Sequence, residues 1–218
     1  SSLSRPPGAG AGPRRTRNAA PNALFLMRLF ASRNAPCYLP PLSESNFLSL
    51  NDVRGLRLDA TDAMGVMRDG PVARFAGRLI LLLNDQLAVV VDRACLHRYG
   101  RLESRLHTPA DVLLDDASAR ISGESAHLTL QFAADVDASL HYAIDPLTVP
   151  GPTSHMMRRC SNDQVHEGTL ITLISRQENA ELSLDGACND NEQTVTVQTP
   201  EQDWRIPLDP TLLVNGNR

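Results

Sequence analysis

Two short apolar runs separated by turn-forming residues constrain the fold of this chain most strongly. The runs are Leu79 to Leu83 and Leu87 to Val91, and Asn84-Asp85-Gln86 lie between them. Each run has the length of a strand, so the pattern predicts a β-hairpin. Neither run alternates with polar residues, so both faces of the hairpin are expected to be covered. Burying each large aliphatic side chain contributes roughly 1.5–3 kcal/mol, so about ten of them outweigh local preferences elsewhere.

Most of the remaining chain alternates apolar and polar residues with a period of two, as strands that bury one face do. The alternating segments are 56–59, 101–106, 126–132, 140–144, 180–184 and 194–197. Turn formers such as Gly123, Pro146 and Asp185-Gly186 separate them. No stretch keeps helical periodicity beyond about three turns. We therefore predict an all-β fold, an antiparallel β-sandwich formed by residues 46–218 as one domain.

The 79–91 hairpin does not fit a plain two-layer sandwich, because such a sandwich covers only one face of each sheet. Its second face requires a further covering. Three coverings fit the sequence: a third sheet layer, the N-terminal segment, or a domain outside this chain.

Residues 1–45 differ in composition from the rest of the chain. They are rich in Pro, Gly and Arg and contain no alternating run, so we predict a disordered leader. Residues 22–31 are apolar but Arg28 interrupts them, so there is no clean signal peptide. Two origins stay open: a poorly ordered native leader, or non-native residues such as a shifted reading frame of GC-rich DNA.

The distributions of charge and cysteine limit which classes of partner and metal site this chain is expected to have. All 21 basic residues are Arg, and the net charge is −4. Residues 1–40 hold six Arg and no acid, so subtracting their +6 from −4 leaves −10 for the remainder, which disfavours nucleic acid as a partner. No apolar run approaches the roughly 20 residues of a membrane span. The four cysteines lack zinc-site spacing, so no structural metal is expected, and they fit both reducing and oxidising compartments.

The residues around the hairpin resemble a known family. Arg78 leads an apolar strand that turns into a Val-rich strand ending in Asp92-Arg93, followed by His97 and then Leu102-Glu-Ser-Arg-Leu-His107. This arrangement is similar to the C-terminal β-sandwich of heparinase II/III-like polysaccharide lyases, over roughly residues 70–185.

The resemblance implies a lyase that acts on acidic polysaccharides in the periplasm or outside the cell. Such enzymes cleave beside a uronic acid by β-elimination: the carboxylate is neutralised, a base removes the C5 proton, and an acid protonates the leaving oxygen. The family places an Asn or His and a Tyr for this chemistry on an N-terminal α/α toroid. Another His lies early in its β region, in some members beside a zinc site.

This chain departs from the family pattern at its catalytic features. It has no helical toroid, and its six histidines form no His-x-His, His-x-Asp or His-Asn pair. No catalytic or metal-binding residue is therefore carried over, and no cofactor is evident. The expected function is the C-terminal β-sandwich portion of such a lyase, with the toroid outside this chain. The alternative, from another class, is a non-catalytic carbohydrate-binding or scaffold module. An upstream reading frame that encodes a toroid would support the lyase, and its absence would support the non-catalytic module.

The densest polar group that can contact a sugar acid follows the hairpin: His97, Arg98, Tyr99 and His107. Tyr can act as an acid, Arg can pair with a carboxylate or sulfate, and His can act as a base. The alternative interpretation is a plain loop, with His107 ending the next strand.

Two further histidine groups are weaker candidates. His127 and His141 lie diagonally if Leu130 pairs with Leu140, which can begin a metal site, but a solvated polar face is preferred. The second group is a basic cluster that can bind an anionic chain, and it consists of His155, Arg158, Arg159 and His166. The preferred interpretation of this group is a surface loop whose Arg stems lie on neighbouring apolar groups. Asp92 and Arg93 are expected to fix a turn, and Trp204 to pack in the core.

Overall fold

The computed structural model describes residues 44–50, 53–61, 64, 66–67, 70–115, 117–123, 127–145, 154–186 and 193–208. The predicted disordered leader lies outside these residues, except that Glu44 and Ser45 begin the first strand. The regular elements of the described residues are all β-strands, so the all-β prediction is confirmed. Within the same residues, no helix has the length and apolar character needed to cross a membrane.

The largest element is an eight-stranded sheet in which every pair of neighbours is antiparallel. Its strands, in spatial order, are β1 (Glu44–Leu50), β2 (Val53–Asp59), β5 (Ala73–Leu82), β6 (Leu87–Gly100), β13 (Val165–Ser175), β10 (His127–Ala134), β9 (Ser118–Ser122) and β8 (Asp111–Leu114). We call it the middle sheet.

Two three-stranded antiparallel sheets and one short ribbon complete the described fold. The first sheet has the order β11 (Ala138–Asp145), β12 (Ser154–Ser161), β7 (Glu103–Thr108). The second has the order β14 (Glu181–Asp185), β15 (Thr194–Gln198), β16 (Asp203–Pro207). The ribbon pairs β3 (Val66–Met67) with β4 (Gly70–Pro71).

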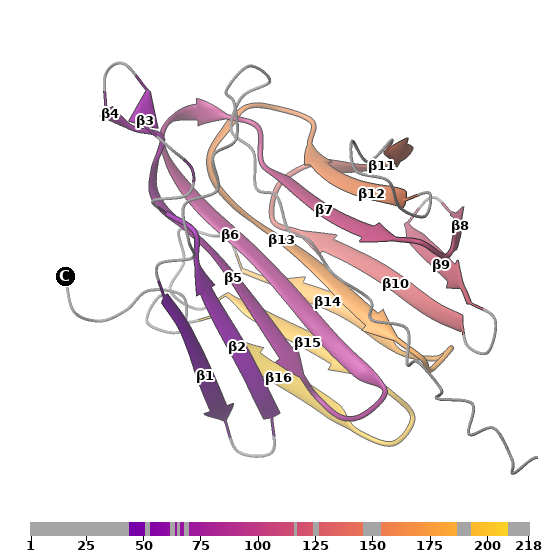
Figure 1. The fold of residues 1–218 in the computed structure, drawn as a ribbon. Helices are drawn as coiled ribbons and strands as arrows, with labels where there is room; N and C mark the ends of the chain where they lie inside the picture. Colours follow the sequence, from indigo (N-terminus) through magenta and orange to yellow (C-terminus); the bar gives the residue numbers. More distant parts are fainter. Residues whose placement is uncertain are drawn as a thin grey trace, which may run out of the picture.

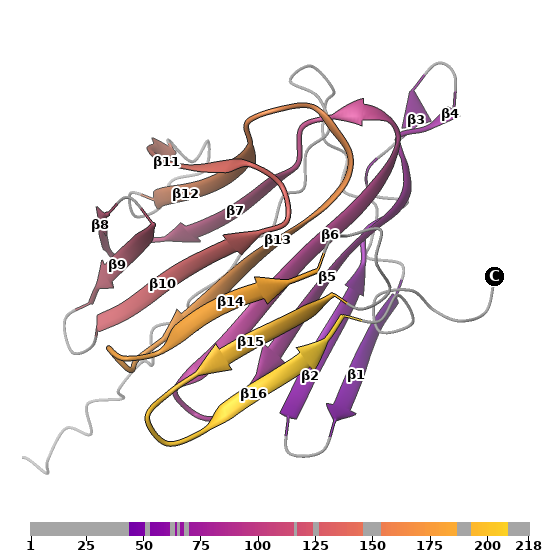
Figure 2. The ribbon, with the colours of Figure 1, turned by 180° about the vertical axis from the view of Figure 1, so that it is seen from behind.

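The three sheets form three layers. The β7–β12–β11 sheet lies in front of the middle sheet in Figure 1, and the β14–β15–β16 sheet lies in front of it in Figure 2, which shows the opposite side. The two outer sheets lie on opposite faces of the middle sheet and are offset along it. Where they overlap, at the Arg78 end of the hairpin, the structure has three layers.

The predicted hairpin is present, and its strands are longer than predicted. Leu83 N–H donates to the carbonyl of Leu87 at 3.0 Å, and the Asn84 side-chain oxygen accepts from the Gln86 N–H at 2.8 Å. The first strand begins at Ala73, where it pairs with Leu96 of β6, and the second ends at Gly100, where it pairs with Val165 of β13. Asp92 therefore lies inside a strand.

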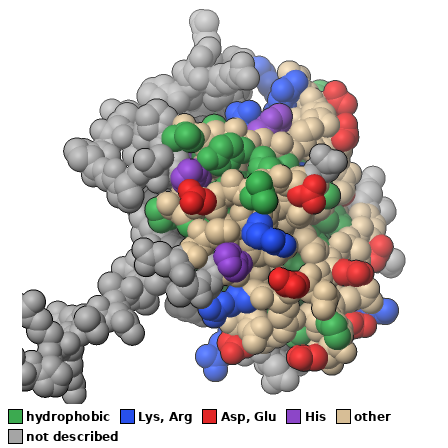
Figure 3. All heavy atoms as spheres, turned by 90° about the vertical axis from the view of Figure 1, so that its right-hand side faces the viewer, with side chains coloured by type: hydrophobic (Ala, Val, Ile, Leu, Met, Phe, Trp, Pro, Cys, Tyr) green, Lys and Arg blue, Asp and Glu red, His purple; other side chains and the backbone are tan. Residues whose placement is uncertain are grey.

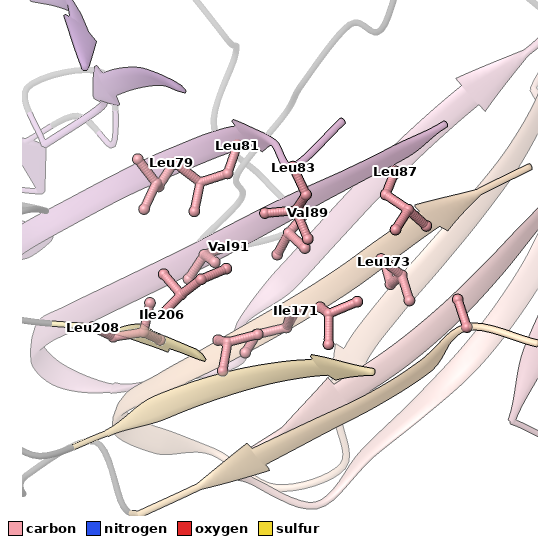
Figure 4. Packing of buried hydrophobic residues seen from close by; sticks show 13 residues of the cluster. Leu79, Leu81, Leu83, Leu87, Val89, Val91, Ile171, Leu173, Ile206 and Leu208 are labelled. Atoms are coloured by element: carbon pink, nitrogen blue, oxygen red, sulfur yellow. The ribbon is translucent and has the colours of Figure 1, made fainter. Parts of the chain in front are cut away.

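One face of the hairpin packs on β14–β15–β16 and forms the largest core (Figure 4). The hairpin supplies alternate residues to it, which is why an uninterrupted apolar run still has one fully buried face. The buried members are Leu79, Leu81, Leu83, Leu87, Val89, Val91, Ile171, Leu173, Ala180, Val195, Val197, Ile206 and Leu208. The half-buried Trp204 packs against this cluster, as expected of a core tryptophan.

The other face of the hairpin is covered at one end and open at the other. Arg78, Val90 and Asp92 are buried, and Ser104 of β7 lies over this end. Toward the turn, Ile80 is half-buried and Leu82 is 52% exposed. Of the three coverings that fit the sequence, a third sheet layer covers the Arg78 end.

A buried ion pair joins the hairpin to that layer. Arg78 lies directly opposite Asp92, and its Nε and Nη2 donate to the two carboxylate oxygens at 2.5 and 2.6 Å. The Ser104 hydroxyl donates to Asp92 Oδ2 at 2.5 Å and accepts from Arg78 Nη2 at 3.2 Å. The expectation that Asp92 fixes a turn is wrong, because its partner lies across the ladder. These three polar residues hold β7 against β5 and β6.

The chain passes from the middle sheet to the outer sheet between β10 and β11, so Leu130 does not pair with Leu140, and the condition for placing His127 diagonally from His141 is not met. Both edges of β10 are already occupied, by β9 and β13, and β11 pairs with β12 instead. Asp135 anchors the crossing: its Oδ1 accepts from the Thr169 N–H at 2.7 Å and its Oδ2 from Gln193 Nε2 at 2.9 Å. The neighbouring Gly168 permits this close approach, since a Cβ there would lie 2.8 Å from a side-chain methyl carbon of Val136.

A separate core fills the space between β7–β12–β11 and the β8–β9–β10 end of the middle sheet. Its buried residues are Leu106, Ala119, Ile121, Leu130 and Met157. The alternation of Leu102, Ser104 and Leu106 therefore directs these side chains inward, as predicted. It follows that the residues between them face away from the middle sheet.

Candidate functional site

Three of the four predicted substrate contacts lie in a bulge at the end of β6. Cys95 pairs with Glu167 and Gly100 with Val165, so four residues of β6 lie opposite a single residue of β13. The extra residues include His97, Arg98 and Tyr99, whose side chains are all exposed. Bulges of this kind redirect side chains away from the regular ladder, and they occur often beside functional sites.

Tyr99 has an aromatic neighbour in the bulge. Its ring centroid lies 3.9 Å from that of His166, with 45° between the ring planes, while the tyrosine stays 66% exposed. His166, predicted as part of a different basic cluster, is thus brought beside the first group. The arrangement presents a phenol and an imidazole together at the surface.

The fourth predicted contact, His107, is not brought to the bulge. It lies near the far end of β7, which leads away from the end of β6 (Figure 1). It lies four residue steps along the strand from Glu103 at the start of β7, a span of about 13 Å. His107 instead lies opposite Met156 of β12.

The surface on which His107 lies is the face of β7–β12–β11 directed away from the middle sheet, which we call the outer face. The register assigns its residues, because Met157 and Leu106, opposite each other, are buried inward and their neighbours alternate. Its members with described side chains are Glu103, Arg105 and His107 of β7, Met156, Arg158 and Cys160 of β12, and Ser139, His141 and Ala143 of β11.

A basic row crosses the outer face. Arg105 lies directly opposite Arg158, and Arg158 lies directly opposite His141 on its other side. Directly opposed residues have Cβ atoms about 4.5–5.5 Å apart, so the row spans about 10 Å. On the side of the molecule that lies at the right of Figure 1, histidine and arginine side chains lie among acidic and hydrophobic ones (Figure 3).

One carboxylate lies against this row. Glu103 Oε1 forms an ion pair with Arg105 Nε and lies 3.9 Å from Arg158 Nε. The side chains of Glu103 and Arg105 are 12% and 20% exposed, so this pair is partly shielded from water. Beside it, burial raises the pKa of the Cys160 thiol, and Glu103 raises it further. Cys160 therefore stays a neutral thiol at physiological pH.

The remaining predicted clusters are divided among several places. Arg159, next to Arg158 in sequence, faces inward with its guanidinium carbon 5.8 Å from the Phe132 ring centroid. Burial lowers the pKa of Arg159, while Asp137 opposes that shift. His127 is exposed, and its Nδ1 lies 3.2 Å from the Ser122 hydroxyl within the middle sheet. His127 and His141 thus belong to different sheets.

A tyrosine–histidine pair that the sequence did not suggest joins strands β11 and β12 near β8 of the middle sheet. Tyr142 Oη is 2.5 Å from His155 Nδ1, and the two rings stack with centroids 5.9 Å apart. His155 Nε2 lies 3.9 Å from Asp111 Oδ1. Such a pair can pass a proton between phenol and imidazole. No local signal connects these residues, because they come from β11, β12 and β8.

Within the part of the chain that the structure describes, no cluster of three or more His, Cys, Asp or Glu side chains has the arrangement needed to hold a metal ion.

The fold is similar to solved structures of heparinases. A crystal structure of heparinase III matches 74% of this chain with a TM-score of 0.55 and 12% identity. The heparan sulfate lyase HepC from Pedobacter heparinus matches 76% of it with a TM-score of 0.55 and 13% identity. The heparinase III BT4657 gene product matches 75% with a TM-score of 0.55 and 11% identity.

This chain spans about a quarter of each of these structures: 27%, 28% and 27% of their respective lengths. At these identities the similarity establishes a shared fold, and with it a distant structural relation to heparinases. No protein-family model matches the sequence. No curated protein matches it either.

Proposed function

We propose that this chain is the C-terminal β-sandwich portion of a heparinase II/III-like polysaccharide lyase that acts in the periplasm or outside the cell. The catalytic toroid would lie outside this sequence, and the substrate would be a uronic-acid-containing polysaccharide cleaved by β-elimination. The observation that carries the proposal is the match of three quarters of this chain to about a quarter of the length of three heparinase structures.

The polar residues at the surface are compatible with this role. The Tyr99–His166 pair offers an acid and a base side by side, with Arg98 next in sequence to bind a carboxylate. We keep His97, Arg98, Tyr99 and His107 as proposed substrate contacts, in two separate places. None of them is assigned a catalytic step, because β-elimination also requires the groups that the family carries on its toroid.

The chain alone is expected to cleave no polysaccharide. The assay follows the absorbance of the unsaturated uronate product over heparan sulfate, heparin, alginate and hyaluronan. Sustained turnover that disappears on changing Tyr99 or His97 would contradict the proposal that the catalytic groups lie on a toroid outside this chain.

The matching positive experiment uses the gene that encodes this chain. DNA upstream of the codon for Ser1 is sequenced, and the longest in-frame product is assayed in the same way. We expect an encoded α/α toroid and turnover of at least one of the four polymers. An upstream region without a toroid would instead favour a non-catalytic carbohydrate-binding or scaffold module.

A further inference from the structure

We propose that the outer face of the β7–β12–β11 sheet is a binding surface for a linear anionic polysaccharide, and that Glu103 competes with the ligand for its arginines. The outer face and the Tyr99–His166 bulge share no residue. The choice of ligand class rests on the proposed function, whereas the site itself rests on the register and contacts of the three strands.

The row of basic residues provides the recognition chemistry. Arg105, Arg158 and His141 are fixed on three adjacent strands, so their spacing is set by the ladder and not by flexible loops. Guanidinium groups bind sulfates and carboxylates through paired N–H donors. His107, two residues from Arg105 on the same face, extends the polar surface along β7. An extended polyanion laid across the strands can therefore contact several donors at once.

The other residues of the outer face favour a sugar polymer over a nucleic acid. Apart from the histidines, the outer-face side chains described here include no aromatic ring on which a base could stack. Ser139 adds a hydroxyl and Cys160 a neutral thiol, so neither repels an anion. Glu103 is the single acidic side chain among the outer-face residues that are described.

Glu103 occupies the position that a ligand anion would take. Its carboxylate is paired with Arg105 and lies 3.9 Å from Arg158 Nε. A bound sulfate or carboxylate must displace this group or share the arginines with it, and either arrangement costs affinity. Removing the charge of Glu103 should therefore strengthen binding, whereas removing the charge of Arg158 should weaken it. A surface that merely attracts polyanions over long range responds to net charge alone.

The experiment titrates the full chain with a heparan sulfate hexasaccharide by calorimetry at fixed pH and salt. We expect Arg158→Gln to weaken binding roughly tenfold, the equivalent of about 1.4 kcal/mol. Glu103→Gln should tighten it by several-fold. The matched control is Arg205→Gln, which removes an exposed arginine from β16 on the opposite outer sheet and should change the dissociation constant less than about twofold.

The outcomes separate the site from its alternatives. Equal weakening by Arg158→Gln and Arg205→Gln, or no tightening by Glu103→Gln, would overturn the proposal. Tighter binding of single-stranded DNA of equal charge would also overturn it and assign the face to nucleic acid. If Arg158→Gln does not fold by circular dichroism, Arg105→Gln replaces it in the same comparison. The titration measures binding and not cleavage, so a negative lyase assay does not affect this test. Conversely, absence of hexasaccharide binding would overturn the proposed site but would not show whether the longer gene product is a lyase.

Discussion

Replacing Asp92 with alanine is expected to lower the free energy of unfolding by about 3–5 kcal/mol, the cost of leaving one member of a buried ion pair without its partner. Arg78 is 3% exposed, and both of its donors to Asp92 would lose their acceptor. The Ser104 hydroxyl would lose its acceptor as well, so the attachment of β7 to the middle sheet should weaken with it.

Urea denaturation monitored by circular dichroism measures this loss. Asp203→Ala, on the exposed surface of β16, is the matched control and should change stability by less than about 0.5 kcal/mol. The double change Arg78→Met with Asp92→Leu should recover most of the loss, because two apolar residues need no partner. A loss below about 1 kcal/mol for Asp92→Ala would contradict the buried pair.

The second large effect concerns the two faces of the β5–β6 hairpin. Leu81→Ala is expected to cost about 2–5 kcal/mol, because Leu81 is fully buried in the core against β14–β15–β16. Leu82→Ala, one residue away, should cost less than about 1 kcal/mol, since a side chain that is half exposed gives up less apolar area and leaves no closed cavity.

The same denaturation series compares the two variants. Equal, large losses from Leu81→Ala and Leu82→Ala in a monomeric protein would show that a further segment covers the second face near the turn. A small loss from Leu82→Ala together with improved solubility would agree with the exposure of that end.

The strands were predictable from the sequence because their pattern is local. The alternation of Leu102, Ser104 and Leu106 specifies which side chains face inward, and the apolar runs on either side of residues 84–86 specify the hairpin. The division into layers was not predictable in this way. Leu130 and Leu140 are close in sequence and both alternate, yet they lie in different sheets because the edges of β10 pair with strands β9 and β13.

The residues of the candidate site could also be predicted only where the pattern is local. Alternation alone places Glu103, Arg105 and His107 on one face of a strand. Their neighbours Arg158 and His141 come from β12 and β11, and the sequence had assigned those two residues to separate clusters. Pairing between distant segments leaves no local signal, so Arg105 and Glu103 were missed as site residues. The bulge at the end of β6 was missed for the same reason, because it is defined only by the register with β13.

The most direct test of a polysaccharide-binding surface on this fold is amide chemical-shift mapping with a heparan sulfate hexasaccharide. We predict that the largest shifts fall on 103–107, 139–143 and 156–160, with small shifts on 194–207 of the opposite outer sheet. Shifts concentrated on 97–99 and 166 would assign binding to the Tyr99 bulge instead. Shifts concentrated on 194–207, or no shifts at saturating ligand, would contradict a polysaccharide-binding outer face.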